Sequence, residues 1–396
     1  MGNNMLLSKV REIMLEFSDL TGLSGSGKPP KRYLWTDAFA VCNFLELFRQ
    51  TRQEEFKDLA LRLVAQVHQT LGRHRPDDGR TGWISGLGEA EGSQHPTRGG
   101  LRIGKRLPER RSGERYDEQL EWDRDGQYYH YLTKWMQALN QVTRATGDFL
   151  YNRWALELAQ TAYARFVVLS PSGIGNRMIW KMSIDLSFPQ VPSMGQHDPL
   201  DGFLTCAQLR ETLQKDPEKN TLPALQDELA GMARLCQNQD WSTDDPLGLG
   251  GLLSDALRAA QLVAAGPDLP ADLSATLLAA ALEGLASWGR KNPLDYPADF
   301  RLAFRELGLS IGLQALERLS ALIGAPPDPK TTGSALRPLP GNFSPYAPFR
   351  EQIEAFWLDR RNRAVRSWTD HREINMVMLA TSLAPDGYLT LGEKPE

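Results

Sequence analysis

Apolar residues recur along most of the chain at the spacing of amphipathic helices. They fall at i, i+3, i+4 and i+7, and this period predicts helices rather than strands. The predicted helices cover residues 6–20, 37–50, 55–72, 127–146, 148–169, 174–185, 201–213, 222–238, 247–265, 271–290, 298–323, 349–366 and 371–383. No strand pair is predicted, and residues 167–169 are interpreted as a helix end.

Polar segments rich in Trp, Asp and Pro stand before a long apolar helix six times. A second amphipathic stretch follows most of them, which indicates helical hairpins. The helices that open in this way are apolar on more than one side, as is typical of buried helices. The uneven spacing disfavours a solenoid. The pattern predicts an all-α (α/α)6 toroid of six inner and six outer helices, as one domain over residues 1–396. The six openings are residues 35–39, 122–131, 197–203, 241–251, 292–300 and 368–375.

One long segment after the first hairpin, residues 73–121, breaks the helical pattern. It is rich in Gly, Arg, Pro and Glu, and its ten Lys and Arg nearly cancel its nine Asp and Glu. Connections of this length inside a domain are usually functional lids or flexible insertions. Two apolar islands, residues 82–84 and 100–104, favour an insertion that packs as a lid over the ends of the inner helices.

Composition excludes several classes of function. Hydrophobic residues make up 41% and charged residues 24%, and the formal net charge is −4, so no basic field recruits nucleic acid. No run of about 20 apolar residues predicts a membrane span. The three cysteines have no metal-ligand spacing, and no other cofactor is expected. The first residues lack the apolar core of a signal peptide, so we expect a cytoplasmic protein.

The helix count, the hairpin order and the Trp/Asp openings over residues 33–389 resemble the six-hairpin glycosidase superfamily. That superfamily includes sugar 2-epimerases, unsaturated glucuronyl hydrolases and several endoglucanase families. The resemblance implies the (α/α)6 toroid, with a cleft at the N-terminal ends of the inner helices. It also implies a small-molecule or oligosaccharide substrate. No catalytic signature of a named family is matched, so every role below is inferred from the residues themselves.

The second opening concentrates the side chains that bind sugars. Flat rings stack against the apolar faces of pyranoses, while carboxylates, amides and basic groups bind hydroxyls. One helix cap needs one Asp, and this opening has two. We predict that Asp125 is catalytic. The predicted substrate-binding residues of this opening are Trp122, Asp123, Gln127, Tyr129 and His130. His130 and Lys134, four residues apart, share one helix face.

The other openings and the insertion add further candidates. Asp37, Asp198, His197 and His371 are predicted to be catalytic, and Trp35, Trp83, Arg102, Asp370 and Arg372 are predicted to bind substrate. Capping is the alternative for the opening aspartates, because helix N-termini attract carboxylates. Asp201 is expected to be such a cap. A structural histidine bonded to a carboxylate is the alternative for His197.

Two reaction classes and one binding role follow from these residues. Glycoside hydrolysis needs two carboxyl groups, one of them held protonated, and it is the first hypothesis. Sugar epimerisation needs bases that move a proton beside a carbonyl, and His197 with His371 would serve, with His130 in reserve. A non-catalytic scaffold that binds a glycan or peptide on Trp35, Trp83 and Trp122 is the third.

Overall fold

The computed structural model describes residues 3–25, 27–170, 172–173, 175–266, 269–324 and 340–391. The Pro- and Gly-rich stretch predicted to connect the helices at 298–323 and 349–366 lies mostly outside these ranges. The chain divides into two compact units, one of residues 18–239 and one of residues 1–17 with 240–396. The expectation of a single domain stays a prediction.

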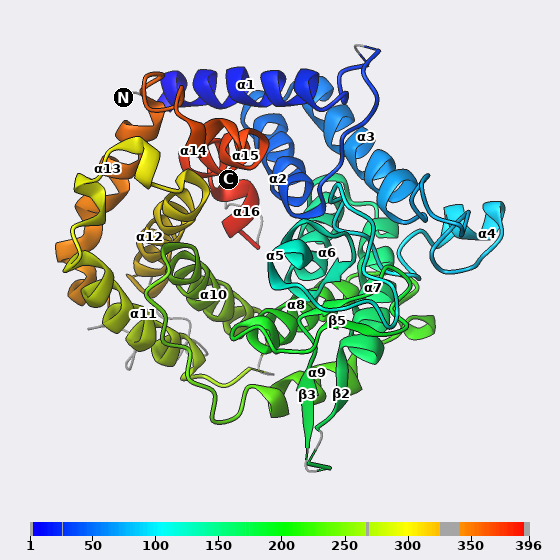
Figure 1. The fold of residues 1–396 in the computed structure, drawn as a ribbon. Coiled ribbons are helices and arrows are strands. Elements are labelled where there is room, and N and C mark those ends of the chain that lie inside the picture. The colour runs from blue at the N-terminus through cyan, green and yellow to red at the C-terminus, as the bar shows by residue number, and fades with distance from the viewer. Residues whose placement is uncertain are drawn as a thin grey trace. The chain divides into compact units, whose positions relative to one another are not determined.

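The unit of residues 18–239 contains three of the predicted helical hairpins (Figure 1). Helix α6 contacts both α2 and α8, and all three are buried along most of their length. Helices α3, α7 and α9 each pack against the inner helix of their own pair. The three pairs are α2 (Leu34–Thr51) with α3 (Glu54–Leu71), α6 (Tyr129–Thr146) with α7 (Leu150–Phe166), and α8 (Asp198–Leu213) with α9 (Gln226–Leu235).

A stretch after α7 forms short strands, and the helix predicted over residues 174–185 is wrong. Strand β2 (Val167–Leu169) pairs antiparallel with β3 (Asn176–Met178), so the interpretation of residues 167–169 as a helix end is also wrong. Strand β4 (Lys181–Met182) lies between β1 (Gln127–Tyr128) and β5 (Pro189–Val191). A short apolar run fits the helical and the strand period equally, and here pairing with the distant β1 decides between them.

The insertion after α3 is packed onto the unit. Its two apolar islands are buried, with Trp83 2% exposed and Leu101 and Ile103 fully covered. Backbone hydrogen bonds join Ile103 N to the carbonyl of Gly126 and the N–H of Leu34 to the carbonyl of Ile103. Two short helices, α4 (Glu89–Gln94) and α5 (Glu118–Asp123), complete it. The packing of the islands is confirmed, and a lid function stays a prediction.

The other unit contains the remaining hairpins. Helices α10 and α12 approach each other at glycines: a Cβ atom on Gly250 would lie 2.0 Å from the carbonyl oxygen of Gly308. The long helices are α1 (Asn3–Leu20, of which residues up to 17 belong to this unit), α10 (Pro246–Ala265), α11 (Leu273–Gly289), α12 (Ala303–Gly324), α13 (Ala347–Leu358) and α15 (Arg372–Leu383). The short ones are α14 (Arg366–Thr369) and α16 (Asp386–Leu389). Across the ranges that the structure describes, no helix has both the length and the apolar character that a membrane span requires.

Candidate functional site

Four ionisable side chains of α6 and α8 meet where both helices begin. His130 and Lys134 lie on the first turns of α6, and Asp198 and Asp201 on the first turn of α8. The Lys134 ammonium donates to Asp201 Oδ1 at 2.7 Å, and His130 Nδ1 lies 3.7 Å from Asp198 Oδ1. The predicted shared face of His130 and Lys134 is therefore the face that meets α8. We call these four residues the α6–α8 cluster.

Burial makes the Asp198 and His130 pair chemically unusual. Asp198 is 4% exposed, and neither its Oδ2 atom nor His130 Nδ1 has a hydrogen-bond partner among the described residues. Burial, with the nearby charge of Asp201, raises the pKa of Asp198 from 3.8 to about 8. Burial also lowers the pKa of His130 to about 4. At neutral pH the pair is a protonated carboxyl beside a neutral imidazole, which gives one proton donor and one proton acceptor.

Local sequence sets the entry into α8. His197 is the N-cap residue and Pro199 occupies the first turn, so Asp198 begins the helix. Asp201 is not the cap that the sequence predicts, because α8 starts three residues earlier and its carboxylate pairs with Lys134 instead. A Cβ atom on Gly195 would lie 2.5 Å from Asp198 Oδ2, so only glycine leaves room for this carboxyl.

An aromatic wall borders the cluster. The rings of Tyr128 and His130 are stacked with centroids 5.4 Å apart, and those of Tyr128 and Trp180 lie 4.9 Å apart. Trp122 meets Trp180 edge to face at 5.3 Å and is 54% exposed. This aromatic wall consists of Trp122, Tyr128, Trp180 and His130. Sequence reasoning missed Trp180, because its segment was taken for a separate helix and the pairing of β4 with β1 brings it here.

A lysine of the insertion reaches the same wall. The Lys105 ammonium donates to the Trp122 carbonyl and, at 3.4 Å, to the Tyr128 hydroxyl. It also lies 5.1 Å from the centre of the Tyr128 ring and 5.8 Å from that of Trp122. Burial lowers the pKa of Lys105 to about 8. The sequence carries no signal for this residue, since the insertion has no period from which a face can be inferred.

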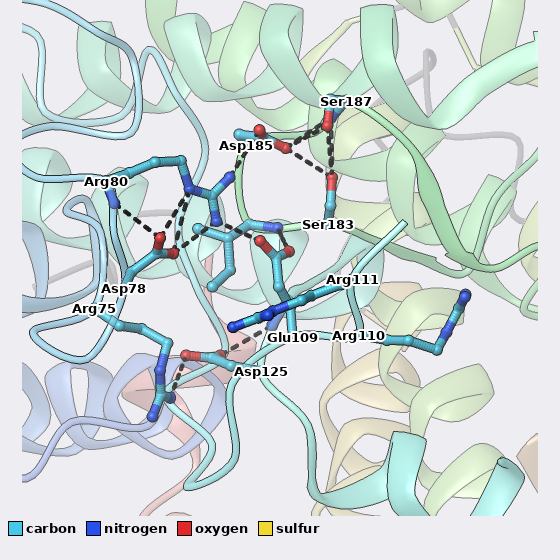
Figure 2. A network of polar contacts seen from close by, with 12 residues as sticks. Arg75, Asp78, Arg80, Glu109, Arg110, Arg111, Asp125, Ser183, Asp185 and Ser187 are labelled. Atoms are coloured by element: carbon cyan, nitrogen blue, oxygen red, sulfur yellow. Dashed lines mark hydrogen bonds and ion pairs between the residues drawn. The ribbon is translucent and has the colours of Figure 1, made fainter. Parts of the chain in front are cut away.

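Asp125 lies at the base of the insertion and is fully buried. Its Oδ2 atom accepts from Arg102 at 2.5 Å and from Arg75 at 3.2 Å, and its Oδ1 atom accepts from the backbone N–H of Gly104 at 3.0 Å. Figure 2 shows Arg75 reaching this carboxylate. Both carboxylate oxygens already accept hydrogen bonds from the protein. This favours a structural role for Asp125 and Arg102 over contact with a substrate.

A second ion-pair network holds the insertion against the segment before β5. Arg80 donates to Asp78 and, at 2.8 Å, to Asp185, and it pairs with Glu109 (Figure 2). Glu109 in turn accepts from the backbone N–H of Ile184 at 2.5 Å. The contacts of Arg80 with Asp185 and of Glu109 with Ile184 join residues more than seventy positions apart, in a segment whose composition alone predicts irregular structure.

Other predicted residues of this unit are placed in packing or internal bonding. Gln127 is fully buried and bonds to the backbone of Gly99, Leu101 and Ile184. Tyr129 and Trp83 are each 2% exposed, and Trp35 is 6% exposed and packs on Phe39. Asp37 accepts from the Tyr33 N–H and pairs with Arg32, while burial raises its pKa to about 6. Asp123, by contrast, is exposed beside Trp122.

Three predicted residues belong to the other unit. Asp370 accepts from Arg366 at 2.9 Å, Arg372 donates to Glu16 at 2.5 Å, and His371 meets the Phe304 ring edge to face at 5.7 Å. His197 lies in the first unit beside Asp198. The pairing of His197 with His371 in a proton transfer stays a prediction. The described residues contain no group of three or more His, Cys, Asp or Glu arranged to hold a metal ion.

The stability of the protein is expected to report the raised pKa of Asp198. Because this pKa lies above its ordinary value of 3.8, the folded state holds more protons than the unfolded state and loses stability as the pH rises towards 8. The lowered pKa of His130 has the opposite effect, because it makes stability increase with pH. That increase is complete above the ordinary pKa of 6.5. Urea unfolding measures this effect. Between pH 6.5 and 8, the free energy of unfolding of Asp198→Asn should rise relative to that of wild type by up to about 2 kcal/mol. A difference that does not change with pH would contradict the raised pKa.

The similarity of this chain to known proteins is found in structure and not in sequence. No protein-family model matches the sequence, and no curated protein matches it. The structure resembles that of a GH76 α-mannanase from Bacteroides thetaiotaomicron, with 10% identity over 98% of this chain and 96% of that chain and a TM-score of 0.54. A GH76 α-1,6-mannanase from Salegentibacter sp. matches with 12% identity over 96% and 99% of the chains and a TM-score of 0.47. A cellobiose 2-epimerase from Spirochaeta thermophila matches with 12% identity over 94% and 97% of the chains and a TM-score of 0.46.

The similarity to the Bacteroides protein covers nearly the whole of both chains. At 10% identity this similarity concerns the fold and not the residues of a site. It confirms the fold class predicted from the helix order and the Trp/Asp openings. The chain therefore shares the all-α fold of this α-mannanase.

Proposed function

We propose that this protein is a carbohydrate-active enzyme, and specifically a glycoside hydrolase that uses Asp198 as its general acid. The observation that carries the proposal is the Asp198 carboxyl, which is 4% exposed, has one oxygen without a hydrogen-bond partner in the described residues and lies beside His130. Hydrolysis of a glycosidic bond requires a carboxyl group that stays protonated at neutral pH. Burial supplies that property by raising the pKa of Asp198 to about 8.

The proposed reaction assigns different tasks to the two aspartates of α8. Asp198 gives its proton to the glycosidic oxygen as the bond between that oxygen and the anomeric carbon breaks. Asp201, which is paired with Lys134, is the charged carboxylate that faces the developing positive charge. Water then adds its oxygen to the anomeric carbon and gives a proton to Asp201. The products are two shorter saccharides, and exchange with solvent restores both carboxyl groups.

The aromatic wall supports a saccharide as the substrate class. Trp180 lies between His130 and Trp122 in this series of ring contacts, and the 54% exposure of Trp122 leaves its ring open to a ligand. The known α-mannanase with the same fold adds support for the class but not for the linkage. A panel of α- and β-linked oligosaccharides, with α-1,6-linked mannosides included, tests the reaction by release of reducing ends. Failure to cleave any member would count against hydrolysis.

A sugar epimerase or isomerase is the second candidate, and His130 is the observation that favours it. Its Nδ1 atom has no hydrogen-bond partner in the described residues, and its lowered pKa leaves it neutral and able to accept a proton. In this reaction His130 would take the proton beside a sugar carbonyl and Asp198 would protonate the oxygen. Incubation of monosaccharides in D2O separates the candidates, because only proton transfer at carbon exchanges hydrogen for deuterium there.

Replacing Trp122 with Ala is expected to weaken saccharide binding and leave the fold intact. The ring is 54% exposed, so its removal costs little packing, whereas a stacked sugar would lose a contact worth about 0.5–1.5 kcal/mol. Calorimetric titration of the best substrate should show a Kd that is higher by up to about tenfold. Leu169→Ala, which removes an apolar side chain that is 74% exposed, is the matched control and should leave Kd unchanged. Equal affinity of Trp122→Ala and wild type would remove Trp122 from the site.

A further inference from the structure

We propose that Lys105 forms a subsite for a negatively charged group, so that the saccharide bound at the aromatic wall is an acidic one. The group would be a carboxylate, sulfate or phosphate on the sugar. This inference rests on the proposed function for the α6–α8 cluster, and it adds the charge of the substrate. It concerns a residue of the insertion that takes no part in the proposed proton transfers.

The first observation is that the Lys105 ammonium makes contacts with neutral groups only. Its partners in the described part of the chain are the Trp122 carbonyl and the Tyr128 hydroxyl, with the Tyr128 and Trp122 rings beside it. It forms no ion pair there. Lys181, the other lysine at the Tyr128 ring, differs because its ammonium lies 3.2 Å from Glu121 Oε2. A partly buried cation without a counter-ion gains most from an anionic ligand.

The second observation is that two of the three carboxylates whose charges act on Lys105 are already paired. Asp125 accepts from Arg102 and Arg75, and Glu121 accepts from Lys181 and, at 2.7 Å, from Arg110. Neither carboxylate is free to turn towards Lys105. Asp123 is the remaining acidic neighbour, and it is exposed to solvent. The charge of Lys105 is therefore balanced only weakly by the protein.

The third observation is that the Lys105 ammonium lies beside the exposed Trp122 ring. A sugar stacked on Trp122 would bring its substituents next to the ammonium, which lies 5.8 Å from that ring's centre. Neutral hydroxyls can accept a hydrogen bond from Lys105, but an anion also gains the Coulomb attraction of the partly buried ammonium. The geometry therefore discriminates between acidic and neutral sugars that are otherwise alike.

Calorimetric titrations with matched sugars test this inference on the full-length protein. The probes are glucuronate, galacturonate and mannuronate, each against its neutral hexose, together with glucose 6-phosphate and glucose 6-sulfate to identify the anion. At least one acidic probe should bind about tenfold more tightly than its neutral parent, and the preference should shrink as salt is added. Equal affinities for acidic and neutral probes would overturn the inference.

Three variants test whether Lys105 causes the preference for acidic sugars. Lys105→Met should remove the preference and weaken the binding of acidic sugars much more than that of neutral ones, while Lys105→Arg should retain the preference. Asp123→Asn should strengthen it, because the exposed carboxylate repels an anion. The control Lys9→Met removes an exposed lysine of α1 and should change nothing. A preference that survives in Lys105→Met would overturn the inference, and Lys105→Arg together with the salt dependence decides the matter if Lys105→Met does not fold.

The outcomes separate this inference from the proposed reaction. Cleavage that depends on Asp198, without any preference for acidic probes, would support the proposed reaction and exclude the acidic subsite. A preference that depends on Lys105, in a protein whose turnover survives Asp198→Asn, would leave the subsite and remove the reaction. Absence of binding by every probe and every oligosaccharide would overturn both.

Discussion

Asp198→Asn is expected to lower turnover by about 10²–10⁴-fold, which is the usual contribution of a positioned general acid. The amide has the same size as the carboxyl but carries no proton that it can give to a leaving oxygen. The substitution should not damage the fold, because the buried carboxyl is already uncharged at neutral pH and its Oδ2 atom has no hydrogen-bond partner among the described residues. Reducing-end release and thermal unfolding, measured on the same preparation, check both halves of the prediction.

Asp216→Asn is the matched control for this experiment. Asp216 is also an almost fully buried aspartate of the same unit, but its carboxylate accepts from Arg153 at 2.9 and 2.8 Å. Its replacement should lower stability and leave turnover of the folded protein near that of wild type. Asp198→Asn should instead lose turnover and keep its stability. Full activity in Asp198→Asn would exclude Asp198 as the acid for hydrolysis and for the alternative epimerisation alike.

Asp125→Asn is expected to destabilise the protein by about 3–5 kcal/mol, the usual result of breaking a buried ion pair. The carboxylate is fully buried, and both Arg102 and Arg75 donate to its Oδ2 atom. An amide nitrogen at that position would face two guanidinium donors, and an amide oxygen there would turn the nitrogen towards the N–H of Gly104. Either orientation leaves buried donors without an acceptor. Urea unfolding monitored by circular dichroism measures the loss.

Asp123→Asn, two residues away, is the control for the Asp125 experiment. Asp123 is exposed, so its replacement should change stability by no more than about 0.5 kcal/mol. The sequence predicts instead that Asp125 is catalytic. An Asp125→Asn protein that is as stable as wild type but inactive would favour that prediction over the structural role. A destabilised protein with normal turnover in its folded fraction would support the role proposed from the structure.

Most of the long helices were predictable from the sequence, and so was one face of the candidate site. The period of apolar residues is a local property, and it indicated the α2–α3 and α6–α7 hairpins close to their observed bounds. The spacing of His130 and Lys134 placed them together for the same reason, and α8 does meet both. Side chains four residues apart share a helix face in any tertiary setting.

The roles of individual carboxylates depend on the tertiary structure. Asp125 and Asp198 both stand in polar openings of the sequence, yet Asp125 receives two guanidinium donors from the insertion whereas Asp198 Oδ2 receives no hydrogen bond in the described part of the chain. Trp180 and Lys105 reach the aromatic wall only through the pairing of β4 with β1 and the packing of the insertion. The sequence by itself determined where helices form and which side chains share a face, because both follow from a local period. Burial, ion pairing and the protonation that follows from them were decided by atoms from distant segments, which only the tertiary structure brings together.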